Sequence, residues 1–174
     1  MSAALGEGAG QSGPGRRVFL STFEKQLDAK RRFVVPQDYR TPATGSAEGV
    51  FCFPSIEADC IEAGGDALFG QYQRVIDDLP FGHRLRTALE DAVYGQQRRL
   101  SYDTAGRITL PESLCEEFGL TDTVVIVGLR DRFQIWRPDV HRAWRAEQRR
   151  VARDGLAELG ELKRAANLRS GGGE

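Results

Sequence analysis

A short segment of this chain occurs twice, and this duplication constrains the fold more than any other feature of the sequence. The first copy runs from Leu27 to Pro36 and the second from Tyr102 to Pro111, at a constant offset of 75 residues (28 to 103, 32 to 107 and 36 to 111). Each copy reads Asp-x-x-x-Arg, continues with apolar residues at alternating positions and ends at a proline. Such a repeat predicts two copies of one small unit, related by a pseudo-twofold axis.

Each copy is predicted to run from a strand into a helix. Residues 33–35 and 108–110 are β-favouring triplets, and the proline after each triplet ends the strand because it cannot donate to a sheet. Proline is well suited to the start of a helix, so we predict a helix over residues 112–118 that ends at Gly119. Pro42 interrupts the equivalent segment of the first copy, which predicts a shorter helix there.

Downstream of each copy the sequence predicts a β-hairpin. In the second half, two runs of β-branched and aromatic residues, 123–127 and 133–136, flank a turn at Arg130 and Asp131. In the first half, residues 50–53 form one strand of the predicted hairpin and residues 59–62 form the other.

Helical segments separate and follow the two copies. Apolar residues recur at helical spacing from Leu68 to Leu79 and from Leu85 to Val93, and a third helix is predicted to start at Pro138. The predicted organisation is a disordered tail over residues 1–17, a first repeat with its helical insert over 18–94, a second repeat over 95–144, and a C-terminal helix with a disordered end over 145–174.

The net charge of −1 hides a segregation of charge along the chain. Residues 48–91 are acidic, whereas the two repeated motifs are basic, so a local basic face is compatible with a nearly neutral molecule. The near-neutral total argues against a purely electrostatic, polycationic DNA binder. No apolar run is long enough to span a membrane, and three cysteines without a C-x-x-C motif, beside two distant histidines, predict no metal site.

The repeated Asp-x-x-x-Arg motif is suited to binding phosphates or bases. Arginine presents a planar fork of donors that matches phosphate oxygens or a guanine edge, and a nearby aspartate can hold that fork in place. We therefore assign an orienting role to Asp28 and Asp103. The predicted DNA-binding residues are the basic side chains in and near the motifs: Lys25, Lys30, Arg31, Arg32, Arg98, Arg99 and Arg107.

Over residues 18–144 the sequence resembles the MraZ family. The resemblance rests on the segment from Phe19 to Lys30, followed by Arg32 and Pro36, and on two segments of the second half, Gly-Arg-Ile-Thr-Leu-Pro at 106–111 and Arg-Phe-Gln-Ile-Trp at 132–136.

This resemblance implies a fold and a function. The implied fold is α+β, a duplicated swapped-hairpin β-barrel of the AbrB/MraZ type with peripheral helices. The implied protein is a cytoplasmic, nucleoid-associated repressor without enzymatic activity, cofactor or small-molecule substrate. As a ring-shaped homo-oligomer it would bind short direct repeats of double-stranded DNA in the promoter of the division and cell-wall gene cluster. The DNA-binding motif of the family corresponds to Asp28 with Arg32, and to Asp103 with Arg107.

The first copy departs from the family at one position. Glycine usually precedes the motif arginine, as Gly106 does here, but the first copy has Arg31 instead. Since glycine suits a turn with positive φ, arginine at this position predicts either a changed turn or an additional phosphate contact.

Three other functions were weighed against DNA binding. Asp28 and Asp103 could form an aspartic-protease dyad, but cationic neighbours would keep both carboxylates ionised and the protease glycine is absent. Ser21 or Ser101 with His83 lacks the nucleophile-elbow pattern of a hydrolase. A protein-interaction module of the antitoxin type, using the helix that contains Trp144, stays as the alternative, although such antitoxins usually carry one copy of the domain.

Overall fold

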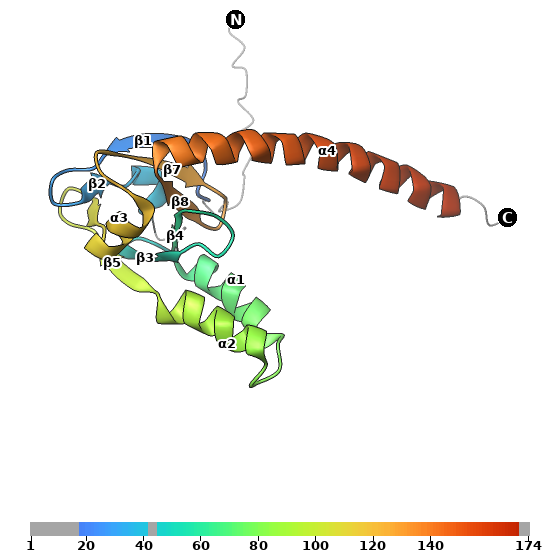
Figure 1. Ribbon diagram of the computed structural model, residues 1–174, viewed down its shortest axis with the longest axis horizontal. Coiled ribbons are helices and arrows are strands. Elements are labelled where there is room, and N and C mark those ends of the chain that lie inside the picture. Colours follow the sequence, from blue (N-terminus) through green and yellow to red (C-terminus); the bar gives the residue numbers. More distant parts are fainter. Residues whose placement is uncertain (1–17, 42–44, 171–174) are drawn as a thin grey trace, which may run out of the picture.

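The computed structural model describes residues 18–41 and 45–170, with the side chains of residues 165–170 excepted. An antiparallel sheet forms its centre; α4 extends far beyond this sheet, and α1 and α2 project from it in another direction (Figure 1). The predicted disordered tail over residues 1–17, the last four residues and Pro42 all lie outside the described residues.

Eight strands form two antiparallel sheets in the described residues. The larger sheet has the order β1-β7-β8-β4-β3-β5, and the smaller one pairs β2 with β6. The strands of the larger sheet are β1 (Thr22–Gln26), β3 (Gly49–Pro54), β4 (Ile61–Gly64), β5 (Arg98–Ser101), β7 (Thr123–Gly128) and β8 (Phe133–Trp136). The smaller sheet, called the ribbon below, consists of β2 (Arg32–Val34) and β6 (Arg107–Thr109).

The two halves of the chain exchange strands. The hairpins β3–β4 and β7–β8 each form within one half, but β1 pairs with β7 of the second half and β5 pairs with β3 of the first. At the centre, β4 pairs with β8 so that Glu62 lies opposite Gln134, and in the ribbon Phe33 lies opposite Ile108. These two pairs join equivalent residues of the two halves, so they lie on the pseudo-twofold axis.

The predicted α+β class is confirmed, but the predicted closed barrel is wrong. The six-stranded sheet ends at β1 on one side and at β5 on the other, and it does not close. The ribbon strands pair only with each other in this sheet arrangement. Each ribbon strand is only three residues long and runs into a proline, which has no N–H donor to extend the ladder.

Aromatic and branched side chains of both halves fill the core beneath the ribbon. Phe33 and Ile108 are almost completely buried, and so is Phe19, which lies at the start of the chain that the structure describes. The rings of Phe19 and Tyr39 meet edge to face, with centroids 4.9 Å apart, and both contact Phe133. This packing supports one face of the ribbon and leaves the other in solvent.

The helices agree closely with the sequence-based predictions. The insert contains α1 (Asp66–Asp77) and α2 (Arg84–Glu90), which a π-helical turn at Asp91–Gly95 extends. In the second half α3 (Glu112–Phe118) ends at Gly119, whose φ is 61°. Among the described residues of the first half, the equivalent place has the 3-10 turn η1 (Gln37–Tyr39), which agrees with the prediction of a shorter helix.

α4 (Pro138–Ser170) starts at the predicted proline, and its far end carries exposed leucines. None of the helices that the structure describes is long and apolar enough to cross a membrane.

Three strands differ from the prediction, and one of them is β1, since no strand was predicted over residues 22–26. Strand β4 begins at Ile61 rather than at residue 59, because the N–H of Cys60 donates to the carbonyl of Ala58 in a tight turn. Strand β5 was not predicted, since its sequence, Arg-Arg-Leu-Ser, is mostly polar. It forms because β3 offers an unpaired edge, and only Leu100 of its four residues is buried.

Candidate nucleic-acid interface

The outer face of the ribbon brings together the arginines of both motifs. In the antiparallel pairing Arg32 lies opposite Thr109, and Val34 lies opposite Arg107. Side chains alternate along a strand, so these four residues share the face opposite to the buried Phe33–Ile108 pair. Thr109 and the 41% exposed Val34 confirm that this face is in solvent. Arg32 and Arg107 are diagonal neighbours, with Cα atoms about 7–8 Å apart.

A loop precedes each strand of the ribbon, and the first loop (residues 28–32) is organised by Asp28. One carboxylate oxygen, Oδ1, accepts the backbone N–H groups of Lys30 and Arg32, both at 2.9 Å. The other, Oδ2, accepts Nε of Arg32 at 2.8 Å and lies 2.8 Å from its Nη2. The carboxylate therefore fixes both the backbone of the turn and the plane of the guanidinium.

The second loop (residues 103–107) has the same geometry. Oδ1 of Asp103 accepts the N–H groups of Ala105 and Arg107 at 2.9 Å, and Oδ2 accepts Nε of Arg107 at 2.7 Å. In both loops the backbone N–H of the aspartate donates to the carbonyl of the arginine at 2.9 Å. The ribbon pairing is antiparallel, so the two loops enter the ribbon from opposite ends and present the same arrangement twice.

These contacts keep both aspartates ionised. Hydrogen bonds from the backbone of the motif arginine, together with its guanidinium, hold the pKa of Asp28 and of Asp103 below the ordinary value of 3.8. Two carboxylates with lowered pKa values cannot share a proton at neutral pH. The aspartic-protease alternative therefore has no support in the geometry of these loops.

Arg31 adopts the backbone conformation that glycine has in the second loop. Its φ is 60°, close to the 75° of Gly106, so the turn is unchanged by the substitution. The side chain turns across the ribbon, and its Nε donates to the carbonyl of Leu110 at 3.3 Å. Of the two sequence-based interpretations of Arg31, the changed turn is wrong. The interpretation as a phosphate contact stays a prediction.

Arg40 contributes to the second loop, although sequence reasoning did not select it. Its Nε donates to the carbonyl of Val35 at 3.0 Å, and its guanidinium lies over the ring of Tyr102. A Cβ atom on Gly106 would collide with this guanidinium. The repeat offset of 75 contained a signal that could have identified Arg40. It aligns Arg40 with the small Cys115 of the second copy, just as it aligns Arg31 with the small Gly106.

The other basic residues predicted to bind DNA divide into two groups. Lys30 is exposed within the first loop, and Lys25 lies on β1 with its Nζ 5.8 Å from the centroid of the Phe23 ring. Arg98 and Arg99 lie on β5, outside both loops. Nη1 of Arg98 donates to the neighbouring carbonyl of Gln97 at 3.0 Å.

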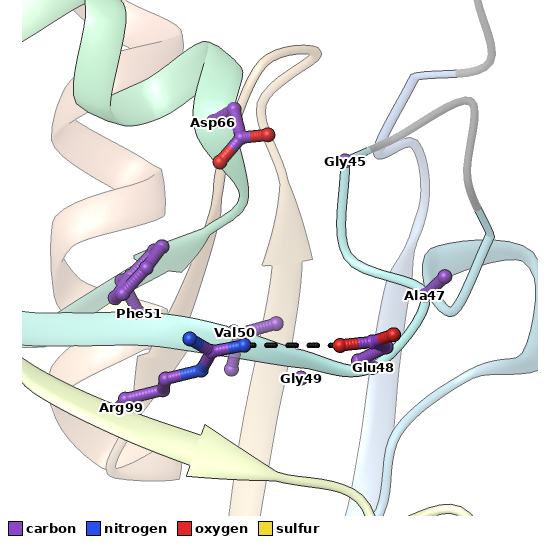
Figure 2. A pocket seen from close by; sticks show the side chains of 8 residues that line it. All are labelled: Gly45, Ala47, Glu48, Gly49, Val50, Phe51, Asp66 and Arg99. Atoms are coloured by element: carbon purple, nitrogen blue, oxygen red, sulfur yellow. Dashed lines mark ion pairs between the residues drawn. The ribbon is translucent and has the colours of Figure 1, made fainter.

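Arg99 points into a hollow at the start of β3 (Figure 2). Its guanidinium lies 5.7 Å from the centroid of the Phe51 ring, and its Nη2 is 3.9 Å from Oε2 of Glu48. Gly45 and Asp66 line the same hollow. Arg99 therefore lies near an acidic side chain at a place outside both loops.

No cluster of histidine, cysteine and carboxylate side chains that could hold a metal ion occurs in the described part of the chain. All three cysteines are buried and free, and burial raises the pKa of Cys52 and Cys60 to about 12, so these two thiols are protonated at neutral pH. His83, considered above for a hydrolase, instead caps α2, with its Nδ1 accepting the N–H of Leu85 at 3.1 Å.

Comparison with known proteins gives consistent matches. The family described as "MraZ protein, putative antitoxin-like" matches residues 94–158. The chain is 65% identical over 155 residues to the transcriptional regulator MraZ of Phenylobacterium zucineum (strain HLK1), which covers 89% of this chain and 97% of that protein.

Two further relatives carry the same name. The chain is 58% identical over 154 residues to the transcriptional regulator MraZ of Caulobacter vibrioides (strain NA1000 / CB15N), which covers 88% of this chain and 99% of that protein. It is 36% identical over 153 residues to the transcriptional regulator MraZ of Xanthobacter autotrophicus (strain ATCC BAA-1158 / Py2), with 87% and 96% covered. The similarity thus spans nearly the whole length of each relative.

Proposed function

The chain belongs to the MraZ family of transcriptional regulators, and on this basis we propose that it binds double-stranded DNA sequence-specifically through the exposed face of the ribbon. It is a regulator and not an enzyme. One observation carries the proposal: two arginine forks, each held by an aspartate, lie together on an exposed two-stranded antiparallel ribbon. The major groove of B-form DNA admits such a ribbon, and a guanidinium can bind the O6 and N7 atoms of guanine there.

The basic residues are proposed to make different contacts according to their position. Arg32 and Arg107 are proposed to contact base edges, because they lie on the ribbon face. Lys30 and Lys25 are proposed to contact phosphates, which supply affinity and position the protein without reading sequence. Arg98 and Arg99 are proposed to lie at the rim of the interface. Asp28 and Asp103 orient the two forks.

The resemblance to the MraZ family supports a more specific role. The proposed targets are short direct repeats in the promoter of the division and cell-wall gene cluster, which the protein represses as a ring-shaped homo-oligomer in the cytoplasm, at the nucleoid. Several ribbons held at regular intervals would bind several repeats at once. The resulting effective concentration raises affinity without any new contact.

Two exposed apolar surfaces support self-association. The helical insert exposes Val75 and Leu85, and Phe81 between its helices is 96% exposed. The far part of α4 exposes Leu156 and Leu162. In a single chain these side chains stay in water, so contact with further copies would remove apolar area from solvent.

A binding experiment tests the proposed function. A fluorescent duplex that carries the upstream region of the protein's own gene is compared with a scrambled duplex of equal length and composition, over a salt series. We expect strong preference for the native duplex and a steep loss of affinity as salt rises, because several phosphate contacts release counterions. Equal and weak binding to both duplexes would contradict the proposal and favour the antitoxin-like alternative, with α4 as the surface for a protein partner.

Light scattering of the full chain at micromolar concentration tests the oligomer separately. A mass several times that of one chain is expected. A monomer would contradict the multivalent part of the proposal and leave the ribbon interface open to the duplex experiment.

A further inference from the structure

We propose that Arg31 and Arg40, although both come from the first half of the chain, occupy equivalent places at the two ends of the ribbon, and that each binds a DNA phosphate beside one of the two loops. The inference rests on the proposed DNA binding by the ribbon and goes beyond it. It adds Arg40 to the interface, and it gives the arginine that replaces glycine at position 31 a defined role.

The two guanidiniums occupy equivalent places. Nε of Arg31 donates to the carbonyl of Leu110, and Nε of Arg40 donates to the carbonyl of Val35. Val35 and Leu110 are equivalent residues, since they differ by the repeat offset of 75 (35 to 110). The N–H of Leu110 binds the carbonyl of Arg31, and the N–H of Val35 binds the carbonyl of Gly106, so each carbonyl lies beside the turn of one loop. At each end of the ribbon one guanidinium therefore binds the carbonyl of an equivalent residue, Leu110 at one end and Val35 at the other.

The two ends of the ribbon reach this arrangement with the arginine and the small residue at exchanged positions. Beside the first loop the guanidinium belongs to Arg31 of the loop itself, and the position equivalent to Arg40 has the small Cys115. The Arg31 guanidinium acts to lower the pKa of this thiol, against the larger effect of burial. Beside the second loop the position equivalent to Arg31 has Gly106, and the guanidinium belongs to Arg40. Because a Cβ on Gly106 would already collide with Arg40, there is room for only one guanidinium at this end.

The remaining donors of both arginines are suited to a phosphate. A guanidinium has five N–H donors, and only the Nε donor of each is used. Among the residues that the structure describes, no acceptor binds the Nη groups of Arg31 or Arg40. Both side chains are half-buried, so they are held in place but keep contact with solvent. A positioned fork with two free nitrogens fits the paired oxygens of a phosphate.

A phosphate is a better ligand for this position than a base. Arg31 and Arg40 turn toward the strand ends, whereas Arg32 and Arg107 lie on the ribbon face. Contacts at the two ends of a ribbon would fix its register along the DNA backbone. We therefore expect these arginines to affect binding to all sequences about equally.

The first test measures the salt dependence of binding for Arg31→Ala and Arg40→Ala. Each variant is expected to bind both the native and the scrambled duplex about 3- to 10-fold more weakly, with the preference between them kept and the slope of log K against log salt reduced by about 1. The variants Arg31→Lys and Arg40→Lys keep the charge and are expected to restore most of the slope. Thermal melting of every variant shows whether the fold is intact.

A merely structural role would give a different result. The melting temperature would fall while the salt slope stayed at the wild-type value, and that outcome would overturn the proposal. If the wild-type chain binds neither duplex, the proposed function itself has failed. If it binds and the slopes of both alanine variants are unchanged, only this inference has failed.

The second test moves an arginine from one place to the other. Arg40→Cys removes the guanidinium from the end of the second loop, and adding Gly106→Arg rebuilds there the combination of arginine and cysteine that occurs naturally beside the first loop. The double variant is expected to recover the affinity and salt slope that Arg40→Cys loses, whereas Gly106→Arg alone is expected to bind poorly because two guanidiniums compete for one place. A double variant no better than either single variant would overturn the equivalence of the two positions.

Discussion

The first loop (residues 28–32) and the second loop (residues 103–107) have different sequences and the same geometry. In both, one aspartate accepts two backbone N–H groups at 2.9 Å and holds the guanidinium of the arginine four residues later. They differ at the residue before that arginine, where Gly106 has a φ of 75° and Arg31 has a φ of 60°. Holding a non-glycine residue in this left-handed region costs about 1–2 kcal/mol. The aspartate and the ribbon pairing therefore fix the turn strongly enough to impose this conformation on arginine.

The comparison shows which parts of the motif the two loops share. The aspartate and the arginine are the same in both loops, while glycine is replaceable where a side chain finds room. Arg31 finds that room beside Cys115, whereas the same space next to Gly106 contains Arg40. The two loops are therefore expected to be equivalent in DNA binding but to differ in the side chains that they accept at positions 31 and 106.

Removing both motif arginines is expected to have the largest effect. Each bidentate contact with a base contributes about 1–3 kcal/mol of discrimination, so Arg32→Ala with Arg107→Ala is expected to lose about 2–6 kcal/mol of specific binding. Neither side chain belongs to the buried core, so the melting temperature is expected to stay close to that of the wild type. Titration of the native duplex measures the loss. Retention of wild-type preference for that duplex would remove the ribbon face from the interface.

Gly106→Ala is expected to be the most damaging change to the second loop itself. Alanine at position 106 would have an unfavourable positive φ, and its Cβ would displace Arg40. We therefore expect the free energy of unfolding to fall by about 1–2 kcal/mol. Urea denaturation measures it. As a matched control, Arg31→Ala introduces no new collision. If Gly106→Ala is no more destabilising than Arg31→Ala, the two turns do not differ as described.

Arg31→Gly is expected to separate stability from binding. The change relieves the left-handed backbone but loses the hydrogen bond to Leu110 and makes the unfolded chain more flexible, so the free energy of unfolding is expected to change by less than about 1 kcal/mol. Affinity for DNA is expected to fall in the same preparation. A large loss of stability would show that Arg31 acts mainly as a structural brace.

Changing the pH is expected to have the smallest effect. Because the pKa of Asp28 and of Asp103 is lowered in the folded protein, the stabilisation that each carboxylate contributes is present above 3.8 and is lost only as the pH falls below that value. Melting temperatures of the wild type and of Asp28→Asn, compared from pH 8 to pH 5, are expected to differ by a constant amount. A difference that shrinks within this window would mean that Asp28 is not held as the structure shows.

Much of the fold could be predicted from the sequence because local patterns determine it. The strand of each copy, the helix ending at Gly119 and the helices of the insert follow from turn residues and apolar spacing. The α+β class was correct, but the barrel was not, since closure of a sheet depends on distant edges that no local pattern describes. Strand β5 was missed for the same reason, because pairing with β3 overrides its polar sequence.

The candidate site was predicted in its centre and missed at its edge. The repeat offset identified Asp28 with Arg32 and Asp103 with Arg107, and the structure places each pair in contact. Arg40 was not selected because its contacts, a carbonyl and a glycine, lie in different segments of the chain. The domain boundaries predicted from the sequence stay predictions, since the exchange of strands between the halves gives neither half a sheet of its own.

If the two loops are equivalent DNA-reading units, as proposed, Arg32→Ala and Arg107→Ala weaken specific binding alike, and a comparison of these two variants tests this equivalence most directly. Affinities of both single variants for the native and the scrambled duplex are measured side by side at one salt concentration. Similar losses are expected for the two variants on the native duplex, each about 5- to 150-fold, and much smaller losses on the scrambled one. Loss of specific binding in one variant, with wild-type affinity in the other, would contradict it.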